Sequence, residues 1–318
     1  MNDPRLRVAI GPVMKGFGSW EWVGHEMAVE LRATFEVVEF SNELPEADVI
    51  VFVKFPPIQT QWPQIAMTTA KIIYCPVDFY GSAAEIEAAG PFLHQCNRVV
   101  VHSQRLARYF QRFSQVEYLD HHVRFFNEEL AECTADGPIL WTGVRTHLPT
   151  LAEWVNQFSL PKDLLVLTNF EQCEDDVSAE KFGFSHRNTV TVSRWSEATH
   201  RQAIREASLA IDIRGNDFRE RHKPPTKAMD ALSAGLPLAM NQSAVAVDYL
   251  ESLGFRCVRL PEVFSSESAD GLQTSFERWM SFEYRTETQQ FGQAVRELLS
   301  RRRIGIRLER IIRQAAAV

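Results

Sequence analysis

The feature that most constrains the fold of this chain is the regular alternation of short β-branched apolar runs with segments of helical period. Amphipathic segments such as WEWVGHEMAVELRA and SQRLARYFQRF lie between the runs. Continuous Val- and Ile-rich runs are typical of buried parallel strands, and strand–helix alternation is typical of βαβ units. The sequence therefore predicts an α/β protein. The expected strands are RLRVAIG, FEVVEF, ADVIVFV, KIIYCPV, RVVVHS and VEYLD, followed by PILWTGV, DLLVLTNF, TVTVSRW, LAIDIRG, LPLAMN and RCVRL.

The alternation pauses once, which indicates two domains. Between VEYLD and PILWTGV lies the polar segment FFNEELAECTADG, and a proline follows it. Exposed polar segments of this kind mark domain boundaries. We place the boundary at about 124–137 and predict two doubly wound α/β domains, residues 1–130 and 131–318. A last helical region, at about 286–316, carries many arginines.

The composition argues against several classes of protein. The 318 residues carry a formal net charge of −7, so no global basic charge indicates a nucleic-acid partner. The sequence contains no run of about 18 apolar residues, so we expect no transmembrane helix. The N-terminus shows no signal-peptide core. The five cysteines are scattered without a C-x-x-C pair, which favours reduced thiols in the cytoplasm over disulfides or a zinc site.

The most informative segment is RERHKPPTKAMDALSAGLPLAMN, which runs from Arg219 to Asn241. A buried strand precedes it, and a short helix is expected to begin near Thr226, which can act as the N-cap. Gly235 is the expected left-handed stop, and Pro237 prevents continuation. In an open α/β sheet, ligands lie beyond the carboxyl ends of the strands, where helix N-termini favour phosphate.

The charges of this segment fit a nucleotide. Lys223 and Lys227 add positive charge at the front of the helix. Asp230 lies one turn further, roughly 5 Å along the axis, where a carboxylate can accept hydrogen bonds from sugar hydroxyls. This arrangement describes a nucleotide or a nucleotide-sugar. The alternative is an ordinary capped helix in which the lysines are solvated and Asp230 pairs with Lys227.

The same segment resembles the donor-binding motif of retaining GT-B glycosyltransferases, the glycosyltransferase group 1/family 4-like enzymes. MDALSAGLPLA resembles their E-A-M/L-A-x-G-x-P-V-V motif, with Asp230 in place of the second glutamate. The resemblance implies that Asp230 binds the donor ribose. His222 stands where the family has its first acidic residue, with Asp217 and Glu220 nearby as substitutes. HKPPTK, in place of the usual Gly-Phe-Gly loop, resembles a Lys-Pro-Pro-x-Lys subset.

The resemblance also implies an architecture and a reaction. Two Rossmann-like domains would face a cleft, with acceptor domain 1–130, donor domain 131–318 and a terminal helix that crosses back. LWTGVRTHLP resembles the first strand and loop of the donor domain. Arg145, Lys223, Thr226 and Lys227 would therefore hold the donor beside Asp230. A nucleoside-diphosphate sugar would give its sugar to an unidentified acceptor (a glycan, a lipid-linked molecule or a small molecule). Because no acidic GT-A metal motif occurs, we expect no metal and no cofactor.

Two further loops supply candidate residues on the acceptor side. GPVMKGFGSWEW follows the first strand, and Gly16 and Gly18 permit a tight turn that contacts an acceptor or a phosphate. Trp20 is a candidate platform for a sugar ring, with packing of the first helix as the alternative. Asp78 follows the fourth strand and is the candidate catalytic residue, as a general base or to orient an acceptor hydroxyl. Its alternative role is helix capping or loop bonding.

Other functions remain open from the sequence. A GT-B protein that binds a nucleotide or sugar phosphate without turnover would explain the missing first acidic residue. A Rossmann oxidoreductase is disfavoured because Glu21 interrupts the glycine pattern, although Glu39 supplies an acid at the end of the second strand. The arginine-rich helix at 296–314 either packs across the two domains or makes peripheral contact with an anionic membrane.

Overall fold

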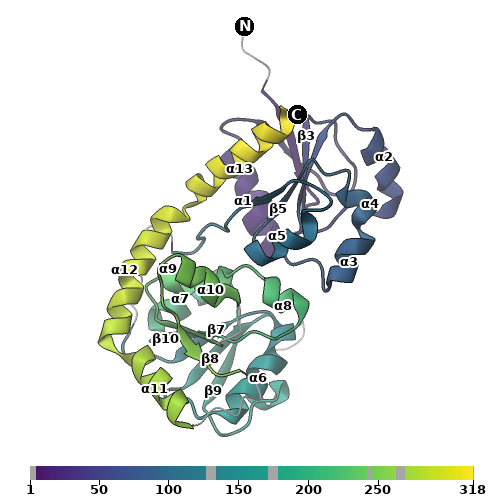
Figure 1. The fold of residues 1–318 in the computed structure, drawn as a ribbon. Coiled ribbons are helices and arrows are strands. Elements are labelled where there is room, and N and C mark those ends of the chain that lie inside the picture. The colour runs from purple at the N-terminus through teal and green to yellow at the C-terminus, as the bar shows by residue number, and fades with distance from the viewer. Residues whose placement is uncertain (1–4, 127–133, 171–177, 242–244, 263–268, 318) are drawn as a thin grey trace. The chain divides into compact units, whose positions relative to one another are not determined.

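A computed structural model describes residues 5–126, 134–170, 178–241, 245–262 and 269–317 (Figure 1). The chain divides into two compact units. The first comprises the chain up to Arg124, Asp217–Pro224 and the chain from Leu299 onward. The second comprises Phe125–Asn216 and Pro225–Leu298. Residues 127–133, within the predicted boundary segment, lie outside the described residues.

The described residues form twelve strands, one at each predicted run, and every strand pair is parallel. The predicted α/β class is therefore confirmed. The first unit contains β1 (Arg7–Gly11), β2 (Glu36–Glu39), β3 (Val49–Val53), β4 (Lys71–Cys75), β5 (Arg98–Val101) and β6 (Val116–Tyr118). The second contains β7 (Ile139–Thr142), β8 (Leu164–Thr168), β9 (Val190–Arg194), β10 (Leu209–Asp212), β11 (Leu238–Asn241) and β12 (Val258–Leu260).

The sheet of the first unit has the order β2-β1-β3-β4-β5-β6. β1 pairs with β2 on one side and β3 on the other, so the direction of strand addition reverses between β1 and β3. All of β3 is buried, which explains its unbroken VIVFV sequence. The short helices of this unit are η1 (Trp20–His25), α1 (Glu26–Leu31), η2 (Gln59–Gln61), α2 (Trp62–Met67), α3 (Ala83–Ala88), α4 (Gly90–Leu93), α5 (Gln104–Phe110) and α8 (Phe218–His222), and the long one is α13 (Arg301–Ala316).

The sheet of the second unit has the order β12-β11-β10-β7-β8-β9, and its reversal lies between β7 and β10. Such a switch point leaves a crevice at the carboxyl ends of the strands, where open α/β sheets bind ligands. The helices of this unit are η3 (Arg145–His147), α6 (Leu148–Gln157), η4 (Ala179–Phe182), α7 (Glu197–Glu206), α9 (Thr226–Ser233), α10 (Val245–Ser252), α11 (Ala269–Met280) and α12 (Phe282–Leu298).

Helix α9 ends as predicted but begins differently. Gly235 has φ 79° and donates to Leu232 O at 2.9 Å, while Leu236 N donates to Ala231 O at 3.0 Å. These bonds form the expected glycine stop. The predicted cap is wrong, because Pro225 is the N-cap residue and Thr226 is already helical. A side-chain cap belongs to the residue before the first helical one, so Thr226 cannot fill that role.

The single helix predicted at about 286–316 is two helices. α12 ends at Leu298, and Ser300 caps the new helix α13 by accepting from Arg303 N at 3.4 Å. A serine at this position favours a new helix start over continuation. α12 packs on α9 in the second unit, whereas α13 packs on α1, β3 and β4 in the first. No helix within the described ranges has both the length and the hydropathy needed to cross a membrane.

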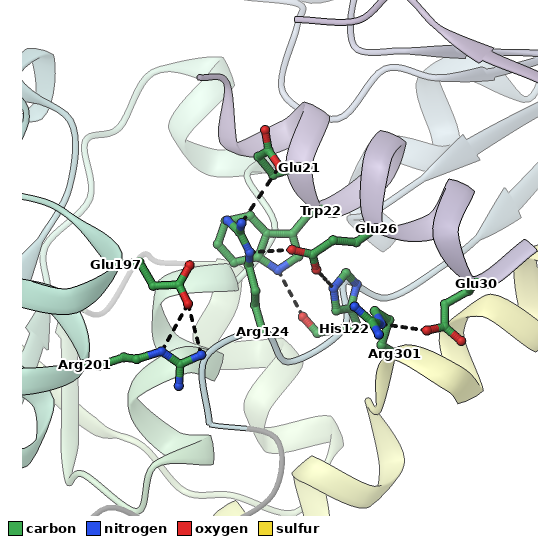
Figure 2. A network of polar contacts seen from close by, with 9 residues as sticks. All are labelled: Glu21, Trp22, Glu26, Glu30, His122, Arg124, Glu197, Arg201 and Arg301. Atoms are coloured by element: carbon green, nitrogen blue, oxygen red, sulfur yellow. Dashed lines mark hydrogen bonds and ion pairs between the residues drawn. The ribbon is translucent and has the colours of Figure 1, made fainter. Parts of the chain in front are cut away.

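A polar network fixes the last residues of the first unit to its first helices. Figure 2 shows His122 and Arg124 reaching Glu26, at 2.5 and 2.6 Å. Burial raises the pKa of Glu26, but His122 and Arg124 outweigh it and leave that pKa below its ordinary value. Trp22 donates to the carbonyl oxygen of His122 at 3.1 Å. Because α1 holds this segment through a charged carboxylate, the point where the chain leaves the first unit is firmly anchored.

Candidate functional site

In the second unit, Lys227 lies against the loop that follows β7. Its Nζ is 4.7 Å from the centre of the Trp141 ring, and Trp141 is fully buried. A Cβ at Gly143 would lie 2.5 Å from the same Nζ. Glycine at 143 therefore lets the ammonium approach the backbone of the β7 loop. The contact places the first turn of α9 at the switch point between β7 and β10.

Arg145 follows on the same loop. Its backbone N donates to Asn169 Oδ1 at 2.8 Å, which ties the loop after β7 to the loop after β8. Its guanidinium lies 5.2 Å from the centre of the Phe182 ring. The side chain is half-buried. Arg145 thus lies on the loop that Lys227 of α9 contacts, and the roles of both residues toward an anion stay predictions.

Asp230 lies one turn into α9, behind Lys227. The residue is only 5% exposed, whereas Thr226 and Lys227 are half-buried. Helix α9 packs on β10 and β11 as well as on α12. Asp230 is therefore a carboxylate inside the second unit, close to the switch point and shielded from water. Its role toward a ribose stays a prediction.

A buried polar network at the carboxyl ends of β10, β11 and β12 was not predicted from the sequence. Arg214 Nε donates to Asp212 Oδ2 at 2.9 Å, and Arg214 N donates to Asn241 Oδ1 at 3.0 Å. Asn241 Nδ2 lies 2.8 Å from both Arg214 O and Glu262 Oε2. These bonds join three strand ends into one rigid rim. The sequence did contain a signal for this network, because two predicted strands end in polar residues, in IDIRG and LAMN.

The segment ahead of α9 was expected to be a loop, but Phe218–His222 of it form the short helix α8. This helix groups with the first unit. Asp217 Oδ1 accepts from Glu220 N at 2.8 Å, and Lys223 Nζ lies 2.5 Å from Glu220 Oε1. His222 is buried, with Nδ1 2.6 Å from Phe218 O. The two acids considered as substitutes for the first acidic residue thus stabilise α8, and Lys223 groups with the first unit rather than with Lys227.

In the first unit, Asp78 forms an ion pair with Lys54. Lys54 Nζ lies 2.7 Å from Asp78 Oδ1, and the two side chains are 20% and 18% exposed. Burial raises the pKa of Asp78, but Lys54 and the nearby Lys223 outweigh it, so the pKa lies below its ordinary value. A carboxylate with a lowered pKa is a weak base. Asp78 is therefore better suited to accept a hydrogen bond from a ligand hydroxyl than to remove its proton.

Two residues at this ion pair have a strained backbone, Lys54 itself and Val77, which precedes Asp78. Lys54 has φ 62° and Val77 has φ 53°, in the left-handed region that residues with a Cβ rarely adopt. Lys54 N donates to Cys75 O at 2.8 Å, and the hydroxyl of Tyr74 donates to Lys54 O at 2.9 Å. Strain of this kind, held by the surrounding structure, is concentrated at functional sites. Lys54 was missed by the sequence reading, although a lysine directly after the buried run VIVFV was a usable signal.

Three phenylalanines surround the ion pair. The ring centres of Phe17 and Phe55 are 5.6 Å apart, and those of Phe55 and Phe79 are also 5.6 Å apart. Lys54 Nζ lies 5.8 Å from the centre of the Phe17 ring, which is 43% exposed. The loop after β1 thus supplies an accessible aromatic side chain from between Gly16 and Gly18. These two glycines are exposed, and Gly16 has φ 86°.

Trp20 does not provide the predicted platform. The side chain is 3% exposed, and a Cβ at Gly24 would overlap its ring. Trp20 packs inside the first unit at the start of η1, so the packing alternative is correct and the platform role is wrong. The accessible aromatic side chain of this loop is Phe17, three residues earlier.

The amino-acid sequence matches no family model and no curated protein. Among the described residues, no three His, Cys, Asp or Glu side chains are grouped in a way that could hold a metal ion. The comparison that does give matches is the one with solved structures.

Three of those matches cover nearly the whole chain. Sucrose-phosphate synthase from Thermosynechococcus elongatus is 13% identical, with a TM-score of 0.62 over 98% of this chain and 100% of that one. AviGT4, a glycosyltransferase involved in avilamycin A biosynthesis, is 11% identical, with a TM-score of 0.63 over 98% of both chains. HepE of Anabaena, solved with UDP and glucose, is 10% identical, with a TM-score of 0.64 over 97% and 100%. Because these structures are GT-B glycosyltransferases, and because identities this low show the fold alone, the chain has the GT-B fold of two Rossmann-like, doubly wound units.

Proposed function

We propose that this protein is a glycosyltransferase that moves a sugar from a nucleoside-diphosphate sugar to a hydroxyl-bearing acceptor, without a metal ion. The observation that carries the proposal is the contact of Lys227, on α9, with the β7 loop that also carries Arg145, at the switch point of the second unit. Two cations at the carboxyl edge of a doubly wound sheet suit a diphosphate. HepE was solved with UDP and with UDP-glucose, which makes a uridine nucleotide the first donor to test.

The proposed donor site assigns one role to each residue. Lys227, Arg145 and the first amides of α9 would neutralise the diphosphate as it leaves, and such electrostatic help is the largest contribution that a site can make to a departing phosphate. Asp230 would accept hydrogen bonds from the ribose. Its burial suits this role, because a hydrogen bond to a carboxylate is stronger away from water.

The proposed acceptor side is the Lys54–Asp78 pair with its aromatic rim. Asp78 would accept a hydrogen bond from the acceptor hydroxyl and fix its direction. Lys54 would keep that carboxylate charged. Phe17 would cover the apolar face of the acceptor, because aromatic rings bury large apolar area. The retaining or inverting outcome does not follow from these residues.

One observation favours a second candidate, a GT-B protein that binds the donor but does not turn it over. His222 occupies the position of the family's first acidic residue and is buried against the Phe218 carbonyl, while Asp217 and Glu220 are bonded within α8. Such a protein would bind the nucleotide as tightly but would release no sugar.

The test is thermal-shift titration with UDP, GDP, ADP, TDP, CDP and NAD(H). It compares wild type with Asp230→Asn, which keeps the shape of the buried side chain, and Asp230→Ala. Asp163→Ala, at an exposed position of the same unit, is the matched control. One nucleoside diphosphate should stabilise wild type and the control, by about 2.7 kcal/mol at a concentration of 100 Kd. The Asp230 variants should lose this effect.

Turnover then separates the two candidates. Hydrolysis of the matching nucleotide-sugar, followed as released nucleoside diphosphate, supports the transferase. Binding without any release supports the non-catalytic protein. Stabilisation by none of the diphosphates, or equal stabilisation of the Asp230 variants, would reject the donor site itself. Stabilisation by NAD(H) alone would instead indicate an oxidoreductase.

A further inference from the structure

A groove of about 560 Å³ lies in the first unit between β6, an edge strand of the sheet, and the last turns of α13. It is distinct from the proposed acceptor site. Lys54 and Asp78 follow the carboxyl ends of β3 and β4, whereas Arg98 of the groove stands at the amino end of β5. The lining residues include Arg98, Gln115, Glu117, Arg307, Arg310 and Ile311.

The innermost cation of the groove is Arg98. The residue is only 8% exposed, and its Nε forms no hydrogen bond within the part of the chain that the structure describes. One terminal nitrogen donates to Asn97 O at 2.8 Å, and the nearest carboxylate is Glu117, with Oε1 3.9 Å from Nε. A buried guanidinium with an unused donor is costly unless an anion lies near it.

Two further arginines come from α13. Arg307 is held by Asp120, at 2.5 Å, and by a bond of 3.2 Å to Tyr118 O, so its position is fixed. Arg310 is exposed one turn later and joins no ion pair among the described residues. Three guanidinium groups therefore face the groove, that of Arg307 already paired with Asp120, and the lining contributes one carboxylate, that of Glu117.

We infer that this groove binds a phosphate monoester with a small polar body. The planar fork of a guanidinium matches phosphate oxygens in pairs, which makes arginine the preferred residue for such sites. The volume is within the usual range for small-ligand pockets and exceeds that of a bare phosphate. The amides of Gln115 and Gln314 and the apolar side of Ile311 supply the wall for the body of the ligand.

Glu117 limits the affinity of this site. Its Oε1 accepts from Gln115 Nε2 at 3.2 Å and lies near Arg98, so it repels an anion that enters the groove. Replacement of Glu117 by glutamine removes this repulsion and keeps the shape. A gain of affinity on this substitution is a result that a purely structural role of the arginines does not produce.

The experiment uses the full chain in an Arg145→Gln background, so that phosphate binding at the proposed donor site is weakened and a failure of the donor site does not affect the result. Glucose 6-phosphate and inorganic phosphate are titrated by calorimetry at constant ionic strength set with chloride. The variants are Arg310→Gln and Glu117→Gln. Arg302→Gln, an exposed arginine of the same helix outside the groove, is the matched control.

We expect saturable binding of glucose 6-phosphate that weakens about tenfold in Arg310→Gln, strengthens several-fold in Glu117→Gln and is unchanged in Arg302→Gln. Equal losses in Arg310→Gln and Arg302→Gln would show general charge attraction and overturn the inference. The inference is also overturned if neither glucose 6-phosphate nor inorganic phosphate binds saturably and the protein does not bind vesicles.

A second arm identifies the source of the phosphate group. Phosphatidylcholine vesicles with and without phosphatidic acid are sedimented with wild type, Arg310→Gln and Arg302→Gln. Binding of glucose 6-phosphate without recruitment to vesicles assigns the groove to a soluble phosphate monoester. Recruitment to phosphatidic acid that Arg310→Gln removes and Arg302→Gln preserves assigns it to a lipid headgroup.

Discussion

Lys54 and Asp78 form an ion pair of 2.7 Å between the carboxyl ends of two adjacent parallel strands, β3 and β4. The lysine and the residue before the aspartate, Val77, both have left-handed backbones. An ordinary surface ion pair contributes about 0–1 kcal/mol and gives no reason to keep strained backbone beside it. Each strained residue costs on the order of 1–3 kcal/mol. This cost supports the proposal that the pair belongs to a ligand site.

Asp78→Asn should reduce sugar transfer roughly a hundredfold, because the amide keeps the shape but presents a misdirected donor to the acceptor hydroxyl. Nucleotide binding at the second unit should not change. Steady-state kinetics with the donor found by titration, together with the thermal shift, check both parts. A normal transfer rate in Asp78→Asn would remove this residue from the proposed acceptor site.

Lys54→Met should change the pH dependence of the same reaction. Lys54 is a main cause of the lowered pKa of Asp78, so the variant should raise that pKa. The acid limb of the pH–rate profile, where Asp78 takes up a proton, should then move to higher pH. The profile of wild type under identical conditions is the reference. An acid limb at the same pH in both proteins would mean that a different group limits the rate.

The strands could be predicted from sequence because their signal is local. Runs such as VIVFV are fully buried, so burial on both faces leaves a continuous apolar pattern that needs no knowledge of the partner strand. The stop of α9 at Gly235 was predictable for the same reason, since a left-handed residue at a helix end is a local requirement.

Candidate residues could be named from sequence only where they lie on or beside an element that the pattern located. Arg145 follows β7, and Lys227 and Asp230 lie in the first turns of α9, while their roles stay predictions. Lys54 could not be paired with Asp78, because their contact depends on which two strands are neighbours in the sheet. Thr226 was misjudged as a cap because the helix start depends on the backbone of Pro225, and Trp20 because exposure depends on what packs around it.

Lys227→Met should weaken binding of the nucleoside diphosphate about tenfold with little change in melting temperature. The methionine keeps the apolar packing on Trp141 and removes only the charge. Lys181→Met, at an exposed lysine of the same unit, is the control and should bind normally. Equal affinity of the two variants would show that Lys227 is a packing residue.

Gly292→Ala should destabilise the second unit by about 1–3 kcal/mol, because α12 packs backbone to backbone on α9 there. A Cβ at 292 would overlap the carbonyl oxygen of Leu232, which cannot move without disturbing α9. Gly18→Ala is the matched control, since its Cβ would meet the Trp22 ring only at 3.5 Å. Urea unfolding of both variants checks the difference. Equal midpoints would mean that α12 shifts freely along α9.

Burial lowers the pKa of four histidines, His102, His121, His200 and His222, and so makes stability depend on pH. Burial lowers the pKa of His200, in the second unit, to about 4, and it lowers the pKa of His102, in the first unit, to about 4. An unfolded histidine has a pKa of about 6.5, so between about pH 4 and 6.5 the unfolded chain binds protons that the folded chain excludes. Stability is therefore fully present above about pH 6.5 and falls as the pH drops toward 4, by roughly 3 kcal/mol for each of these two histidines.

His200→Phe should flatten this slope. The phenylalanine keeps an aromatic ring beside Phe125, which lies 4.8 Å from the His200 ring centre to centre, and it takes up no proton. Urea unfolding between pH 4.5 and 7.5 should show the variant losing less stability than wild type as the pH falls. His102→Phe removes a proton site of the first unit and should flatten the slope by a similar amount, with the two effects adding in the double variant because the sites lie in different units. A wild-type slope retained in the double variant would mean that other groups, such as His121, His222 or carboxylates, control the acid sensitivity of this fold.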